Sequence, residues 1–116
     1  MSKTVIYHNP RCSKSRETLA LLEGQQQDIE IVEYLQSPPS VTELTTLLKQ
    51  LGMQPRQLLR TKEALYKELQ LNNDNLSDQQ LIEAMCANPK LIERPIVIKN
   101  NQAIIGRPPE AVLDIL

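Results

Sequence analysis

The residues best suited to chemistry lie in one short segment, His8-Asn9-Pro10-Arg11-Cys12-Ser13-Lys14-Ser15-Arg16. It places a single thiol among three strongly basic side chains and no acidic one. A helix is expected to begin directly after Cys12, so that the N–H groups of its first turn would point at the sulfur. Both influences favour the thiolate over the thiol. We therefore predict that Cys12 is a nucleophile whose sulfur is turned outward.

The spacing around this cysteine excludes two well-known thiol mechanisms. Ser15 stands where a dithiol oxidoreductase of the Cys-x-x-Cys type has its second cysteine, so no disulfide can close within the segment. A tyrosine-phosphatase loop needs five residues between its cysteine and its arginine, whereas Arg16 lies only four positions after Cys12. The other cysteine, Cys86, falls on a predicted helix and is expected to belong to the core. A second thiol, if one takes part, must therefore come from outside this segment.

A predicted β-hairpin brings two arginines together. Residues 96–98 and 103–105 are aliphatic and flank two adjacent asparagines, which tolerate the positive φ of a tight hairpin turn. A turn centred between those asparagines pairs residues whose numbers sum to 201, and Arg94 and Arg107 satisfy that sum. Two guanidinium groups this close would repel each other unless an anion lay between them. The alternative is that they form ion pairs with Glu93 or Glu110.

Charge balance suggests what that anion is. A thiolate and a phosphate-like oxyanion together carry about three negative charges, which about three arginines would balance. Arginine suits this task because its planar donor group can bind two oxygens at once. The hairpin supplies two, and a third would come from Arg56 or Arg60, between which spacing alone does not choose.

The hydrophobic pattern predicts the elements that carry these residues. Residues 5–7 and 29–35 read as strands on either side of a helix over residues 13–23, and such a β-α-β unit implies a parallel pair. Residues from about 40 to 90 read as a helical insert with two capping boxes. The hairpin and a helix beginning at Pro108 and Pro109 complete the chain. We predict an α/β, thioredoxin-like fold (β-α-β, helical insert, β-β-α) with a mixed four-stranded sheet, as a single domain over residues 1–116.

Composition narrows the partners. The 116 residues hold 13 Lys and Arg against 14 Asp and Glu, with no basic block, which argues against binding to nucleic acid. No apolar run approaches the ~18 residues of a membrane span. The N-terminus has no signal-peptide pattern, and two cysteines are too few for a disulfide framework. We expect a cytoplasmic protein with a small-molecule partner.

Several motifs together resemble the glutaredoxin-coupled arsenate reductase (ArsC) family. They are the segment 8–16, Leu58-Leu59-Arg60, Glu93-Arg94-Pro95-Ile96-Val97 and Gly106-Arg107-Pro108. The resemblance implies that Cys12 attacks arsenate and that the oxyanion is held by Arg60, Arg94 and Arg107. It thereby selects Arg60 over Arg56. It also implies that His8 and Ser15 stabilise the thiolate, although His8 read by itself is equally well a strand-end residue bonded to backbone.

The resemblance also implies a mechanism. The Cys12 thiolate displaces an arsenate oxygen to give an arsenic(V) thioester, glutathione attacks as co-substrate, and glutaredoxin completes the reduction to arsenite. No bound cofactor, metal or nucleotide is required. The peptide bond before Pro95 would be cis. The chain ends at Leu116, whereas well-known members of the family continue further, so we expect a short-chain member.

Two other functions remain open from the sequence. One is a glutathione-linked thiol oxidoreductase that acts on another oxyanion or on protein mixed disulfides. The other is a regulator that resembles the Spx family and binds RNA polymerase. Many Spx proteins carry a Cys-x-x-Cys redox switch, and Ser15 occupies its second position here.

Overall fold

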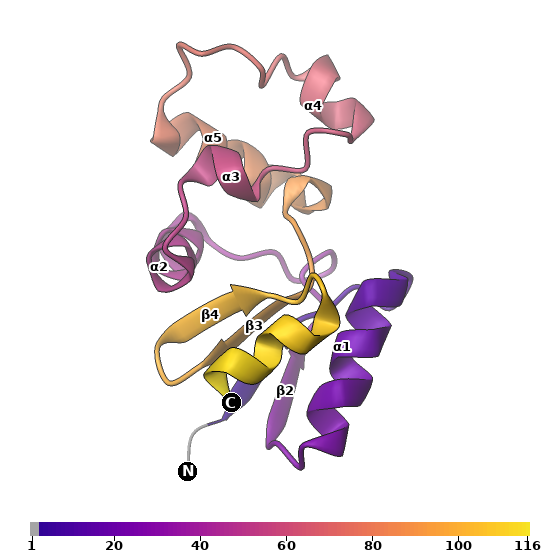
Figure 1. Ribbon diagram of the computed structural model, residues 1–116. Helices are drawn as coiled ribbons and strands as arrows, with labels where there is room; N and C mark the ends of the chain where they lie inside the picture. Colours follow the sequence, from indigo (N-terminus) through magenta and orange to yellow (C-terminus); the bar gives the residue numbers. More distant parts are fainter. Residues whose placement is uncertain (1–2) are drawn as a thin grey trace. The chain divides into compact units, whose positions relative to one another are not determined.

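The computed structural model describes residues 3–116 and divides them into two compact units (Figure 1). The first unit combines the chain up to Ser37 with Arg94–Leu116. The second is the continuous stretch Pro38–Glu93. The helical insert expected at about 40–90 falls within this second unit. Each unit is described by itself below.

A mixed four-stranded sheet forms the centre of the first unit. Its strands are β1 (Thr4–Tyr7), β2 (Ile29–Val32), β3 (Ile96–Lys99) and β4 (Gln102–Ile105), in the order β2-β1-β3-β4. Strand β2 runs parallel to β1, whereas β3 is antiparallel to both β1 and β4. This arrangement confirms the predicted sheet and the thioredoxin-like fold.

Helix α1 (Ser13–Gly24) and the 3₁₀ helix η2 (Pro109–Ile115) pack on one face of the sheet. Alternate strand residues point to this face, as a period of two requires. The sheet and the two helices together bury a compact apolar cluster, and removing these side chains from water is the main force that holds α1 against the strands. The fully buried members are Ile6, Leu22, Val97 and Val112. The predicted C-terminal helix is present, as a 3₁₀ rather than an α-helix.

Strand β2 is shorter than the sequence suggested. The prediction extended it to residue 35, but it ends at Val32 because the Glu33 carbonyl accepts N–H groups from residues 36 and 37 and so starts a turn. Within that turn Tyr34 is 1% exposed, and its ring stacks on Tyr7 with centroids 6.4 Å apart. Burial of this aromatic ring explains why the apolar pattern continues past the end of the strand.

The second unit is helical. Its elements are α2 (Val41–Leu51), α3 (Pro55–Leu58), α4 (Ala64–Glu68), α5 (Asp78–Ala87) and the 3₁₀ helix η1 (Pro89–Leu91). Helix α5 packs against α2, α3 and η1. Both predicted capping boxes are present, at the N-termini of α2 and α5, where serine hydroxyls accept backbone N–H groups. Among the described residues, no helix is long and apolar enough to span a bilayer.

Candidate active site

Cys12 is the N-cap residue of helix α1. Its backbone is extended, with φ −95° and ψ 124°, and no side chain caps the helix. The Cys12 carbonyl accepts the Arg16 N–H at 3.0 Å, while its own N–H donates to the Asn9 carbonyl at 3.0 Å, which fixes the residue at the start of the helix. The first turn contains no acidic residue. The sulfur therefore lies at the positive end of the helix dipole, as predicted.

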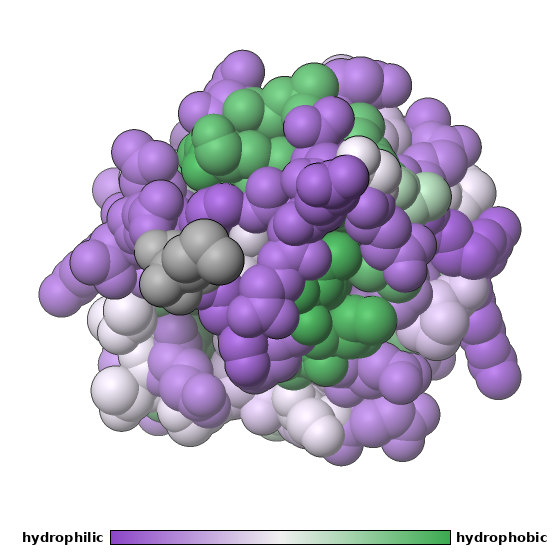
Figure 2. Space-filling view, turned by 90° about the horizontal axis from the view of Figure 1, so that it is seen from below, coloured by the Kyte–Doolittle hydropathy of each residue, from purple (hydrophilic) through white to green (hydrophobic). Residues whose placement is uncertain are grey.

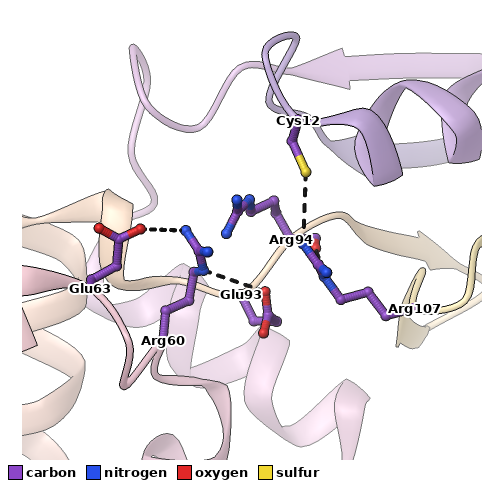
Figure 3. Close-up of polar contacts among 6 residues, drawn as sticks. All are labelled: Cys12, Arg60, Glu63, Glu93, Arg94 and Arg107. Carbon is purple, nitrogen blue, oxygen red and sulfur yellow. Dashed lines mark hydrogen bonds and ion pairs between the residues drawn. The ribbon is translucent and has the colours of Figure 1, made fainter.

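A guanidinium group approaches the sulfur directly. Arg107 Nη2 lies 3.7 Å from Cys12 Sγ, and Figure 3 shows the Arg107 side chain extending toward the cysteine. Cys12 is only 9% exposed, so the expectation of an outward-facing sulfur was wrong. The contact agrees with the prediction, from charge balance, that Arg107 of the hairpin shares a site with the Cys12 thiolate. A positive group at this distance stabilises a thiolate and leaves a thiol almost unaffected.

The hairpin that carries Arg107 has the predicted register. Asn100 and Asn101 both have positive φ, at 53° and 63°, and the strand pairs sum to 201, as in Ile96 with Ile105. The pattern continues past the strands to Arg94, whose carbonyl accepts a hydrogen bond from Arg107 Nε at 2.8 Å. This bond orients the guanidinium that faces Cys12. The two arginines thus lie at the open end of the hairpin, as predicted.

Two peptide bonds at this end are cis, Arg94–Pro95 and Arg107–Pro108. The first confirms the expectation drawn from the family resemblance. The second was not predicted, because nothing in the residues around it distinguishes it from an ordinary bond before proline.

The His8 side chain meets Ser15. The distance from His8 Nδ1 to Ser15 Oγ is 2.6 Å, and Ser15 Oγ also accepts the Asn9 N–H at 3.0 Å. Both side chains are buried. Burial lowers the pKa of His8, and Arg16 lowers it further, while Glu33 opposes the change. The imidazole is therefore neutral near pH 7.

The neutral state of His8 decides which hydrogen bond Ser15 can donate, because the Ser15 hydroxyl has one proton. If His8 Nδ1 carries a proton and donates it to Ser15 Oγ, the serine proton is left for another acceptor. The contacts that the structure describes for Ser15 are with His8 and Asn9. Its predicted hydrogen bond to the thiolate stays a prediction.

Within the helical unit, the structure separates the two arginines that spacing could not. Arg56 donates to the backbone carbonyls of Leu71 at 2.8 Å and Asn73 at 3.1 Å, so it has a structural role. Arg60 Nη1 lies 2.6 Å from Glu63 Oε1, and Arg60 Nε lies 3.6 Å from Glu93 Oε1 (Figure 3). Arg60 is the half-buried arginine with carboxylate partners. Glu63 was not among the predicted site residues, although its spacing of three residues from Arg60 favours a pair on one side of a turn.

Cys86 has a different environment from Cys12. It is half-buried rather than fully in the core, because the buried side of α5 is formed by residues 81, 82 and 85. Burial raises the pKa of the Cys86 thiol, and the negative charges of Glu43 and Glu83 raise it further. Near neutral pH this cysteine is a thiol and a poor nucleophile. Over residues 3–116 there is no cluster of three His, Cys, Asp or Glu side chains that could hold a metal ion.

Known proteins with similar sequences and structures point the same way. The ArsC family model matches residues 7–115. A protein named arsenate reductase from Haemophilus influenzae is 56% identical, with 97% of each chain covered. An uncharacterized protein of Escherichia coli K12, YfgD, is 58% identical over all of this chain and 99% of its own. The structure of an arsenate reductase from Vibrio cholerae superposes with a TM-score of 0.96 at 58% identity, covering 98% of each chain.

Proposed function

Because this chain belongs to the ArsC family, we propose that it is an oxidoreductase that reduces arsenate to arsenite, with glutathione and glutaredoxin supplying the electrons. One observation carries the proposal: Arg107 lies 3.7 Å from the sulfur of Cys12, which itself caps the N-terminus of α1. That pairing puts the proposed nucleophile and a cation suited to an oxyanion in the same place. The relative from Haemophilus influenzae bears the name of the same activity.

Three arginines share the binding of substrate in this proposal. Arg94 and Arg107 both lie at the open end of the hairpin, where the Arg107 guanidinium donates a hydrogen bond to the Arg94 backbone carbonyl. Arg60 is the third, which the family resemblance selects, and the structural role of Arg56 supports that choice. Together with the helix dipole, these groups offset the charge of a thiolate and a tetrahedral oxyanion, about three in total.

The reaction balances with two external thiols. Cys12 forms a sulfur–arsenic bond and one arsenate oxygen leaves as water. Glutathione displaces a second oxygen at the same arsenic. Attack by the glutaredoxin thiol on the glutathione sulfur then leaves two electrons on arsenic, which becomes arsenic(III), and yields the glutaredoxin–glutathione mixed disulfide. Water releases arsenite and regenerates Cys12. The sum is arsenate plus two thiols giving arsenite, one disulfide and water.

Ser15 and His8 assist the nucleophile in this proposal. With His8 neutral, its Nδ1–H can donate to Ser15 Oγ, and the serine hydroxyl can then donate to the sulfur. A hydrogen bond to the charged form favours that form. We place the protein in the reducing cytoplasm, where glutathione is available and both of its cysteines stay thiols.

Arsenate-dependent oxidation of NADPH tests the proposal, in a mixture with glutathione, glutaredoxin and glutathione reductase. We expect turnover by the wild type and by Cys86→Ser, and none above background by Cys12→Ser. Phosphate and sulfate serve as alternative oxyanions, and a glutathionylated protein as an alternative substrate. Turnover of the glutathionylated protein alone would replace arsenate reduction with a glutathione-linked thiol oxidoreductase activity. Absence of all turnover would reject both.

A further inference from the structure

The end of strand β4 touches helix α1 at a place with no room for a side chain. A Cβ atom added to Gly106 would lie 2.7 Å from Thr18 Oγ1, 3.1 Å from Thr18 Cγ2 and 3.0 Å from Pro95 Cγ. Packing at such distances forces a neighbour to move. Glycine therefore allows the hairpin and the helix to approach more closely than any other residue would.

The neighbours of Gly106 are held in place. Thr18 is completely buried, and its Oγ1 donates to the Lys14 carbonyl at 2.8 Å, which fixes its side-chain rotamer. Pro95 is buried and has a rigid ring, and its carbonyl accepts the Gly106 N–H at 2.9 Å. An added methyl group is thus accommodated most easily by displacing the end of β4 from α1.

That displacement would change the distance between Arg107 and the Cys12 sulfur. Arg107 directly follows Gly106, while Cys12 caps the same helix that carries Thr18. We propose that Gly106 and Thr18 are positioning residues, whose contact sets the distance between the Arg107 guanidinium and Cys12 Sγ. At 3.7 Å the contact is already long, so a small movement breaks it. The proposal rests on the Cys12–Arg107 pair of the proposed function, but it holds for any oxyanion that the site accepts.

Alkylation of Cys12 by iodoacetamide tests this contact without arsenate. In a Cys86→Ser background, the ratio of the rates at about pH 6 and about pH 9 reports the thiolate fraction, because the intrinsic reactivity of the thiolate cancels. We expect Gly106→Ala to lower this ratio by about fivefold, which corresponds to the net contribution of one ordinary hydrogen bond. Gly24→Ala is the matched control, since nothing lies within 4 Å of the position of its added Cβ, and it should leave the ratio unchanged.

A second substitution separates positioning from general damage. Thr18→Ala removes two of the three side-chain atoms that the new methyl would meet, including the nearest, and leaves Pro95 Cγ. Gly106→Ala combined with Thr18→Ala should therefore recover part of the wild-type ratio. Thr18→Ser keeps the hydroxyl, which is the nearest atom, and should not restore the ratio. Thermal unfolding of each variant measures its stability separately.

Several results would overturn the proposal. One is a Gly106→Ala variant that loses stability but keeps the wild-type ratio, and another is equal rescue by Thr18→Ala and Thr18→Ser. If Gly106→Ala does not fold, Thr18→Ile crowds the same contact from the helix side, and an unchanged ratio in that variant would also reject the idea. Failure of arsenate turnover combined with the expected alkylation pattern would reject the proposed function and leave the positioning contact standing.

Discussion

Replacing Arg107 by glutamine should make Cys12 markedly less reactive below neutral pH. The substitution removes the positive charge that lies 3.7 Å from the sulfur and keeps a side chain able to donate a hydrogen bond. At that separation a pair of unit charges interacts by about 1 kcal/mol in water and about 4.5 kcal/mol at an effective dielectric constant of about 20. Arg107 is exposed, which places its contribution near the lower figure, at about 1 to 1.5 kcal/mol.

Alkylation measures this change directly. Each 1.4 kcal/mol corresponds to about a tenfold change in an equilibrium, so the ratio of iodoacetamide rates at about pH 6 and about pH 9 should fall by about five- to tenfold. The measurement belongs in a Cys86→Ser background, which leaves Cys12 as the one remaining thiol of the chain. High salt should reduce the difference, because exposed charges are screened.

Arg11→Gln is the matched control for this prediction. It removes the same charge from an exposed residue next to Cys12 in the sequence. We expect a change of less than about twofold, typical of a screened surface charge. Two results would refute this reasoning: a wild-type ratio of alkylation rates in Arg107→Gln, or an equal fall of that ratio in Arg11→Gln. Either would show that the Cys12 thiolate does not depend on the contact with Arg107, and this contact would then no longer support the proposed function.

Three further predictions concern other side chains. Because burial lowers the pKa of His8, this side chain binds a proton more readily in the unfolded chain than in the folded one. The free energy of unfolding should therefore fall as the pH drops below about 6.5. Denaturant titrations should show a weaker dependence of this free energy on pH in His8→Gln than in the wild type. If Arg60 binds arsenate as proposed, Glu63→Gln removes a carboxylate that would compete with it and should lower the KM for arsenate by up to about fivefold, whereas an unchanged KM would count against Arg60 as a ligand. Arg56→Gln loses two bonds to backbone carbonyls and should cost about 1 to 3 kcal/mol in chemical unfolding, with kcat/KM of the folded enzyme unchanged; a loss of kcat/KM would exchange the roles of Arg56 and Arg60.

Features that depend on neighbours along the chain were predictable. The two asparagines at 100 and 101 require a turn with positive φ, and that turn fixes the register by which Arg94 and Arg107 meet. The same holds for the two serine capping boxes, in which each hydroxyl bonds an N–H group three residues away. Contacts between residues a few positions apart are enough to decide these features.

Other features of the site depend on residues far apart in the sequence. The 3.7 Å contact at the Cys12 sulfur is made by an arginine 95 residues later, and the need for glycine at position 106 reflects a threonine on α1. The separate roles of Arg56 and Arg60 follow from the carbonyls and carboxylates that each one meets. No spacing rule contains this information.

The sequence by itself determined the order of strands and helices, the position of Cys12 at a helix start, and which two arginines share a hairpin, because turns, caps and strand registers are set by residues a few positions apart. Only the tertiary structure decided how close Arg107 comes to the sulfur, that His8 is buried against Ser15, and that β2 ends at Val32. Those outcomes depend on how side chains fill shared space and exclude water, and close packing couples all of them at once.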